Sequence, residues 1–133
     1  MDDCVFCDIV RGEVPCRLVL ETDLAICFVS TDDQVDYHLL VVPKRHAVNI
    51  LDCDAASLRA VADLTQRVAR HLVADCGFDG VDLLNTSFEG DQSVFHFHVH
   101  MLARSHGDGL DTWPRLPGRA ISLDESWRRV KMK

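Results

Sequence analysis

The stretch "VFHFHVHML", residues 94–102, carries a histidine at every second position. His96, His98 and His100 alternate there with apolar residues, namely Phe95, Phe97, Val99 and Met101. Successive side chains of a β-strand point to opposite faces, so the pattern predicts a strand with three imidazoles on one face and a core on the other. Exposed strand faces usually carry mixed polar residues, so a row of three imidazoles indicates chemistry.

Three interpretations of this row are open from the residues alone. The first is a solvent-exposed face without function. The second is a metal site, but on a regular strand rising about 3.3 Å per residue the first and third rings would stand roughly 13 Å apart, so at most two rings could share one ion. In the third, one imidazole is a nucleophile and its neighbours orient it, bind charge or hold a metal. A neutral imidazole is well suited to attack phosphorus near pH 7.

The composition predicts one small acidic domain. The chain has 133 residues, 47% of them hydrophobic, and a net charge of −7. A chain of this size can bury roughly two-thirds of its unfolded surface, so we expect a single domain over 1–133 that needs no disulfides. The negative charge argues against general binding to nucleic acid or anionic membranes. No apolar run approaches the roughly 20 residues of a membrane span. The N-terminus is acidic where a signal peptide would be basic, so a cytoplasmic location is expected.

The order of the expected elements favours an α+β fold. Hydrophobic patterns predict a short helix over 4–11, a long helix over 54–76, and strands over 16–22, 24–30, 38–44, 81–88 and 94–104. Because no βαβ alternation is visible, we expect an antiparallel sheet with the long helix against one face. Residues 115–133 mix glycine, proline and charge and are left unassigned.

The long helix has the clearest pattern in the chain. Its apolar stripe recurs at steps of three or four: Leu58, Val61, Leu64, Val68, Leu72 and Cys76. Asp52 or Asp54 can cap its N-terminus, and Gly77 supplies the C-terminal stop. Cys27 and Cys76 lie in apolar segments, so both are expected to be small core residues.

Several segments resemble one known family. The segments "CVFCDIVRGEVP", "HLLVVPKRH" and "NTSFEGDQSVFHFHVH" resemble the opening, the G-H-x-L-V-I-P-K-x-H strand and the N-x-G-x-x-G-G-Q-x-V-x-H-x-H-x-H block of the histidine triad (HIT) family. "RSHGDGL" and "TWP" resemble endings of its branches, so the resemblance covers about residues 4–114. It implies a HIT-like α+β fold: a five-stranded antiparallel sheet with one long and one short helix. It also implies a homodimer whose sheets join.

The resemblance implies an activity and a set of roles. HIT proteins are nucleotide hydrolases and transferases. This chain would therefore cleave phosphorus–nitrogen or phosphoanhydride bonds at the α-phosphate of nucleoside phosphoramidates or dinucleoside polyphosphates. His98 would be the nucleophile that carries the nucleotidyl group, and His100 would lie beside the phosphate and leaving group. The residues matching those that contact phosphate or the scissile linkage are Asn85, Gln92 and Ser93. The expected partner is a purine nucleotide or nucleotide conjugate.

A C-x-x-C pair near the N-terminus suggests a metal. As a redox pair, Cys4 and Cys7 would usually precede a helix in a thioredoxin-like setting, which is absent here. As half a zinc site they need two more ligands. Some HIT relatives place zinc on such a pair, on a histidine after the P-K strand and on the first triad histidine. The resemblance therefore implies a structural zinc at Cys4, Cys7, His46 and His96, the alternative being two unligated thiols.

Four positions depart from the family pattern. Ser30 stands where the family carries the Asp that holds the ribose hydroxyls, and Tyr37, Ser87 and Asp91 stand where Gly is usual. Asp32 or Asp33 could replace the missing carboxylate, whereas a carboxylate at position 91 would repel a phosphate. Two alternatives therefore stay open: a non-catalytic nucleotide-binding or interaction protein on this fold, and a metal-dependent hydrolase using two triad histidines. The sequence specifies neither the physiological substrate nor the base preference.

Overall fold

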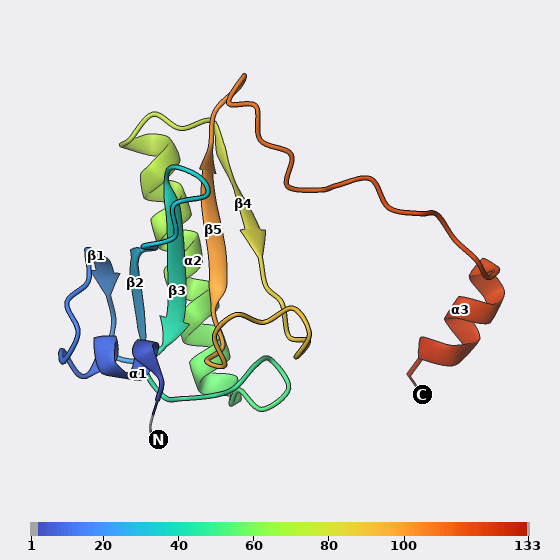
Figure 1. The fold of residues 1–133 in the computed structure, drawn as a ribbon, viewed down its shortest axis with the longest axis horizontal. Coiled ribbons are helices and arrows are strands. Elements are labelled where there is room, and N and C mark those ends of the chain that lie inside the picture. The colour runs from blue at the N-terminus through green and yellow to red at the C-terminus, as the bar shows by residue number, and fades with distance from the viewer. Residues whose placement is uncertain (1–2, 133) are drawn as a thin grey trace.

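The computed structural model describes residues 3–132, which form one five-stranded sheet and three helices (Figure 1). The elements follow in the order α1 (Val5–Val10), β1 (Leu18–Glu21), β2 (Ala25–Val29), β3 (His38–Pro43), α2 (Ala55–Ala74), β4 (Gly80–Leu84), β5 (Val99–Arg104) and α3 (Leu123–Val130). The predicted α+β fold, with a long and a short helix beside the sheet, is confirmed. The third helix lies in the segment that the sequence left unassigned.

The sheet is antiparallel throughout, with strand order β1-β2-β3-β5-β4. β5 therefore lies between β3 and β4, and its His100 is paired with Leu40 on one side and Leu84 on the other. β4 and β1 are the two edge strands. This order places the end of the histidine row well inside the sheet and leaves the backbone of β4 open on one side.

The long helix α2 covers one face of the sheet, as the apolar stripe predicts. Val61, Leu64 and Val68 are buried and pack in one cluster with strand residues of β2, β3 and β5. The Asp54 carboxylate accepts a hydrogen bond from the Ser57 N–H at 3.0 Å and caps the helix. The helix ends at Ala74, two residues earlier than expected, and Cys76 is exposed. The expectation that Cys76 is a core residue was therefore wrong, whereas Cys27 is fully buried.

A smaller apolar cluster on the opposite face holds α1 against the sheet. Phe6 packs there with Ile26 and Phe28 of β2 and with Leu40 and Val42 of β3. Because β2 and β3 are covered on both faces, they are continuous apolar runs rather than alternating ones. The position of α1 bears on the histidine row, because the ring of Phe6 on α1 packs against His96 and His98.

The segment before β5 is irregular, which corrects the strand expected over 94–104. Regular β5 begins only at Val99, so His96 and His98 precede it. The Phe97 N–H donates instead to the Ala47 carbonyl at 2.7 Å, which ties this segment to the loop after β3. The two faces still alternate. Phe97 is buried under α2, whereas the ring centroids of His96 and His98 lie 5.8 and 5.2 Å from that of Phe6.

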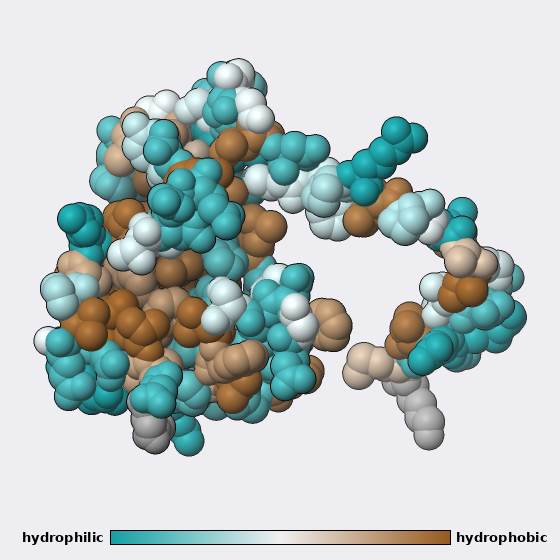
Figure 2. Space-filling model, in the orientation of Figure 1, coloured by the Kyte–Doolittle hydropathy of each residue, from teal (hydrophilic) through white to brown (hydrophobic). Residues whose placement is uncertain are grey.

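The chain leaves the sheet after β5 and ends in α3, which stands apart from the rest of the protein (Figures 1 and 2). Arg104 holds the start of this segment, because its guanidinium donates to Asp82, to Asp108 and to the Leu110 carbonyl. None of the residues of α3 is buried. Among residues 3–132, no helix is both long and apolar enough to cross a bilayer.

Candidate active site and metal centre

A cavity of about 470 Å³ opens beside the histidine row. We refer to it as the triad pocket. Its apolar walls come from α1, β2 and β3, including Phe6, Phe28 and Leu40. Its polar side is formed by Ser30, Asp32, His38, Ser93, His98 and His100. A hollow of this size with convergent polar groups is typical of a small-molecule site.

His98 presents one free ring nitrogen in this pocket. Its Nδ1 lies 2.7 Å from the His96 carbonyl oxygen, which can only accept, so Nδ1 carries the proton and Nε2 keeps its lone pair. The side chain is 4% exposed. Burial lowers the pKa of His98, and the bond to the carbonyl opposes this only in part. His98 is therefore neutral near pH 7 and has the form of a nucleophile.

Asn85 supports the same residue from the backbone. Its amide Nδ2 donates to the His98 carbonyl at 2.8 Å, and its Oδ1 accepts from the Ser87 hydroxyl at 2.9 Å. Ser87 Oγ in turn accepts from the Ile50 N–H at 3.1 Å. Ser87, which stands where the family usually has glycine, is thus part of a chain of hydrogen bonds that ends at His98. In this structure Asn85 holds the backbone of His98 in place.

His100 has the opposite tautomer, and a residue that the sequence analysis missed determines it. Its Nδ1 lies 2.9 Å from Nε2 of His38. His38 Nδ1 is buried and has no hydrogen-bond partner among residues 3–132. Because interiors leave donors unpaired less often than acceptors, we assign the His38 proton to Nε2. His100 Nδ1 then accepts this hydrogen bond, and the proton of His100 is on Nε2, which is free to donate to another group.

Both members of this pair are neutral at physiological pH. Burial, followed by the neighbouring His98 and His38, lowers the pKa of His100 to about 4. Burial also lowers the pKa of His38, against an opposing effect of Asp32. His38 is the first residue of "HLLVVPKRH". It lies on β3, which pairs with β5, and no local sequence pattern shows this adjacency.

The other sequence-predicted residues divide into two groups. Ser93 and Ser30 line the triad pocket, and the Ser30 hydroxyl accepts from the Asp32 N–H at 3.1 Å. Gln92 is buried and does not line it; its Nε2 donates to the Val48 carbonyl at 2.6 Å and so joins two loops. Asp91 is exposed and also does not line the pocket. Its carboxylate is therefore not among the groups a ligand would meet there.

The four predicted metal ligands come together at the end of α1. One ligand atom each of Cys4, Cys7, His46 and His96 lies within 4.8 Å of all the others. The Sγ–Nδ1 distances are 3.3 Å for Cys4–His96, 3.3 Å for Cys7–His46 and 3.6 Å for Cys7–His96, and the two Nδ1 atoms are 3.2 Å apart. Three segments that are far apart in the sequence, namely α1, the loop after β3 and the histidine row, thus meet at this cluster.

This donor set fits tetrahedral zinc. Bonds of about 2.3 Å to sulfur and about 2.0 Å to nitrogen would place sulfur roughly 3.5 Å from nitrogen and two nitrogens roughly 3.3 Å apart. His96 Nε2 donates to the Pro43 carbonyl at 2.8 Å, which leaves Nδ1 unprotonated and turned to the sulfurs. Burial and the neighbouring Cys4 raise the pKa of the Cys7 thiol to about 11. A cation at this point would favour the thiolate instead.

Comparison with known proteins agrees with this geometry. A sequence model of the HIT domain matches residues 11–107. The chain belongs to the HIT family. An uncharacterized HIT-like protein of Methanocaldococcus jannaschii, MJ0866, is 32% identical over 96% of this chain and 98% of its own length. Adenylylsulfatase HINT3 of Arabidopsis thaliana is 30% identical over 93% of this chain, which spans only 64% of that relative.

Solved HIT structures share the fold. A HIT family protein from Bacillus anthracis is 26% identical and superposes with a TM-score of 0.83, over 96% of this chain and 92% of that one. A Zn-bound histidine triad family protein from Mycobacterium smegmatis is 31% identical with a TM-score of 0.76, over 95% and 88% of the two chains. HIT membership is therefore supported by both sequence and structure.

Proposed function

We propose that this HIT protein is a nucleotidyl hydrolase or transferase that acts at the α-phosphorus through a nucleotidyl-His98 intermediate. The observation that carries the proposal is the pair of hydrogen bonds made by Nδ1 of His98 and Nδ1 of His100, to which we assign opposite tautomers. His98 offers a lone pair, because its Nδ1–H is held by the His96 carbonyl. His100 offers an N–H, because His38 occupies its other nitrogen. Its similarity to adenylylsulfatase HINT3 supports nucleotide chemistry in general.

The reaction follows from these two roles. The Nε2 lone pair of His98 forms a bond to phosphorus as the bond to the leaving group breaks. His98 then carries positive charge, which strengthens its Nδ1–H bond to the His96 carbonyl. His100 Nε2–H donates to a phosphate oxygen or to the departing atom, and Ser93 stands beside it in the pocket. Water then attacks the same phosphorus, releases the nucleoside monophosphate and restores neutral His98.

Substrates that fit this chemistry are nucleoside phosphoramidates and dinucleoside polyphosphates. The apolar walls of the pocket, with Phe6, Phe28 and Leu40, favour a purine base as the group opposite the phosphate. Ser30 and Asp32 are the polar groups available at the same cavity for a ribose. The cytoplasmic location expected from the sequence stays a prediction.

Intact-mass analysis tests the intermediate directly. The protein is mixed with adenosine phosphoramidate and quenched within milliseconds to seconds. We expect a mass increase equal to one adenylyl group in the wild type and none in His98→Ala. His71→Ala serves as the matched control, because His71 is exposed on α2 and lies outside the pocket. Turnover by His98→Ala at the wild-type rate would refute the mechanism.

The binding-protein alternative rests on Ser30, which supplies a hydroxyl where the family has a carboxylate. The position of Asp91 outside the pocket removes the second reason for it. If the wild type binds a purine nucleotide but turns over neither phosphoramidates nor dinucleoside polyphosphates, this alternative replaces the enzymatic proposal.

We also propose a structural zinc ion held by Cys4, Cys7, His46 and His96. The gathering of the four ligand atoms within 4.8 Å of one another and the Zn-bound M. smegmatis relative support it. When bound, the ion would join α1 to the loop before β5 and take no part in bond breaking. In the assigned tautomers His98 offers a lone pair to the pocket but His100 presents an N–H there, so an open metal site built on both rings is not favoured.

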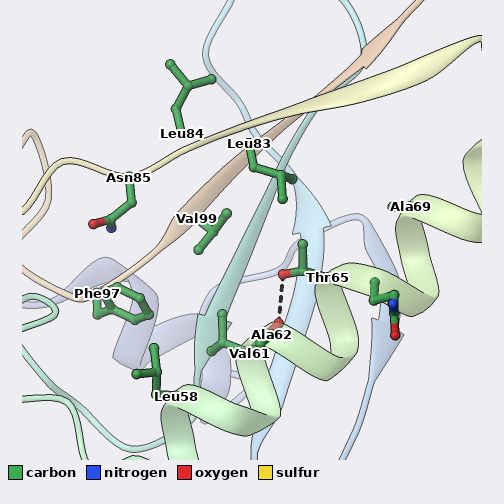
Figure 3. Close-up of a pocket in the computed structure, with 11 residues that line it drawn as sticks. Leu58, Val61, Ala62, Thr65, Ala69, Leu83, Leu84, Asn85, Phe97 and Val99 are labelled. Atoms are coloured by element: carbon green, nitrogen blue, oxygen red, sulfur yellow. Dashed lines mark hydrogen bonds between the residues drawn. The ribbon is translucent and has the colours of Figure 1, made fainter.

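Finally, we propose that two copies pair along the β4 edge. β4 is an edge strand, and its Leu83 and Leu84 are 52% and 37% exposed. A groove of about 540 Å³ runs between β4 and α2 and is lined mainly by apolar side chains (Figure 3). The Thr65 hydroxyl in this groove has its donor satisfied within α2, because it donates to the Val61 carbonyl at 2.7 Å. Sedimentation at micromolar concentration should therefore give a dimer.

A further inference from the structure

A second set of nucleophilic and basic side chains lies at the C-terminal end of α2, where the chain turns toward β4 (Figure 1). Nδ1 of His71 lies 2.8 Å from Oδ2 of Asp75, and Nε2 of the same ring lies 3.5 Å from Sγ of Cys76. Because an ionised carboxylate only accepts, the proton of a neutral His71 ring is on Nδ1, and the lone pair of Nε2 faces the sulfur. We call these three residues the helix-end cluster.

The backbone at the end of α2 brings these side chains together. The His71 carbonyl accepts hydrogen bonds from the Asp75 N–H at 2.8 Å and from the Cys76 N–H at 3.2 Å. Gly77 follows with φ of 83°, the left-handed conformation with which many helices end. The turn folds Cys76 back onto the last turn of the helix, and its sulfur therefore meets the ring of His71.

Cys76 differs from the other five cysteines of the chain. Of the six, all of which the structure describes, it alone is exposed rather than buried or half-buried. Burial raises the pKa of Cys27 to about 12, and burial together with two neighbouring carboxylates also raises the pKa of Cys53. Cys4 and Cys7 belong to the predicted metal site. Exposure and a neighbouring basic group are the properties that distinguish reactive thiols from structural ones.

The surroundings of Cys76 favour proton transfer from its sulfur to the imidazole. The C-terminal end of a helix carries partial negative charge, which disfavours a bare thiolate and favours a histidine cation. When Cys76 gives its proton to His71, the two new charges balance. The imidazolium then donates from Nδ1 to Asp75 and from Nε2 to the thiolate. A nucleophile beside a base that a third group orients is the arrangement of activated nucleophiles.

We propose that Cys76 is a site of reversible S-thiolation by low-molecular-weight disulfides. His71 takes the thiol proton, and the Cys76 sulfur then bonds to one sulfur of the disulfide as the S–S bond breaks. The other half leaves as a thiolate and takes the proton from His71. The products are a mixed disulfide at Cys76 and one free small thiol, and an excess of small thiol reverses the exchange. The site is independent of the proposed enzymatic activity, because no residue of the helix-end cluster lines the triad pocket.

Dithiodipyridine tests the proposal on the full chain, purified without chelators. It is a neutral aromatic disulfide, and absorbance follows the thiopyridone that it releases. After a substoichiometric dose near pH 7, peptide mass mapping should find most of the modification on Cys76, and dithiothreitol should restore the original mass. Cys76→Ser should lose the fast phase of absorbance. Modification mainly at another cysteine, or a fast phase that persists in Cys76→Ser, overturns the proposal.

His71→Gln tests the role of the base. A thiol without such a partner, with an ordinary pKa of about 8.5, is only a few per cent ionised near pH 7, so we expect the fast phase to slow about tenfold. At about pH 10 a thiol ionises without help, so the two rates should converge. His106→Gln removes another exposed imidazole and should react like the wild type. Equal rates for the wild type and His71→Gln near pH 7 overturn the proposal, and a slowing that persists at high pH overturns the role of His71 as base.

Discussion

The rings of His38 and His100 share one hydrogen bond, 2.9 Å long, between Nε2 of the first and Nδ1 of the second. Neither sequence motif nor strand alternation connects these residues, which are 62 positions apart. Their adjacency arises because β3 and β5 pair side by side in the sheet. The bond determines which nitrogen of His100 can donate to a substrate, so its effect on catalysis can be measured.

Removing the His38 donor should slow turnover without unfolding the protein. In His38→Leu, His100 is free to adopt either tautomer, and we expect kcat to fall about tenfold, the equivalent of about 1.4 kcal/mol. In His38→Gln, the amide Nε2 can still donate at the same place, so kcat should stay within about threefold of wild type. Steady-state hydrolysis of adenosine phosphoramidate measures both. Equal rates for the Leu and Gln variants would contradict the assigned tautomers.

Stability should fall with acidity in a defined window. The pKa of His100 is about 4 in the folded protein and 6.5 as the ordinary value. Between these values the unfolded chain binds a proton that the folded chain does not, so the free energy of unfolding decreases as the pH falls from 6.5 towards 4. Above pH 6.5 His100 is neutral in both the folded and the unfolded chain, so the stability that its lowered pKa confers is fully present there.

Urea unfolding at a series of pH values measures this effect. His100→Gln removes the titrating group, so its free energy of unfolding should depend less steeply on pH than that of the wild type within the window. Parallel curves for the two proteins would contradict the lowered pKa. Carboxylates with lowered pKa values, such as Asp82, act below their ordinary value of 3.8. Burial also lowers the pKa values of His38, His96 and His98, so both proteins keep a slope in the window and the difference between the two curves reports His100.

Loss of one cluster ligand should remove the metal and lower thermal stability. We expect about one zinc per chain in the wild type and none in Cys7→Ser, with a lower Tm, because structural zinc contributes folding free energy. Cys76→Ser is the matched control, since Cys76 is exposed and lies outside the cluster. Elemental analysis and calorimetry provide the readouts. Wild-type protein that is free of zinc after purification without chelators would refute the site.

The Tyr37→Gly variant should be more stable than the Tyr37→Ala variant. It has φ of 56°, a left-handed conformation that costs most side chains about 1 kcal/mol, and its ring packs on Phe78 at a centroid distance of 4.9 Å. Tyr37→Ala loses the ring contact and keeps the strain, whereas Tyr37→Gly loses both. We expect the Gly variant to exceed the Ala variant by about 1 kcal/mol in urea unfolding.

The neighbouring position provides the control for that comparison. Asp36 does not have a positive φ, so Asp36→Gly should be less stable than Asp36→Ala. The same ranking at both positions would show that the conformation of Tyr37 carries no strain. A Tyr37→Gly variant more stable than Tyr37→Ala would also explain why a glycine is usual at this position in the family.

Sequence reasoning was most successful where periodicity and burial agree. The stripe of α2 and the apolar runs of β2 and β3 gave the right elements, because their residues pack on neighbours of the same kind. It failed where tertiary hydrogen bonds replace regular structure. Alternation at 94–98 predicts a strand, yet the Phe97 N–H bonds the Ala47 carbonyl and the strand starts later. The role of His38 depends on strand order, which no local pattern contains.

His96 belongs to two sites at once. Its ring nitrogen Nδ1 faces the cysteine sulfurs, and its carbonyl oxygen holds the Nδ1–H of His98. Any shift of this one residue is therefore felt both by an ion in the cluster and by a nucleotide in the pocket. Thermodynamic linkage makes such an influence mutual: whatever factor the ion contributes to nucleotide affinity, the nucleotide must contribute to the affinity for the ion. If the ion raises the affinity for nucleotide, saturating nucleotide must raise the affinity for the ion by the same factor, and if it lowers the one it must lower the other.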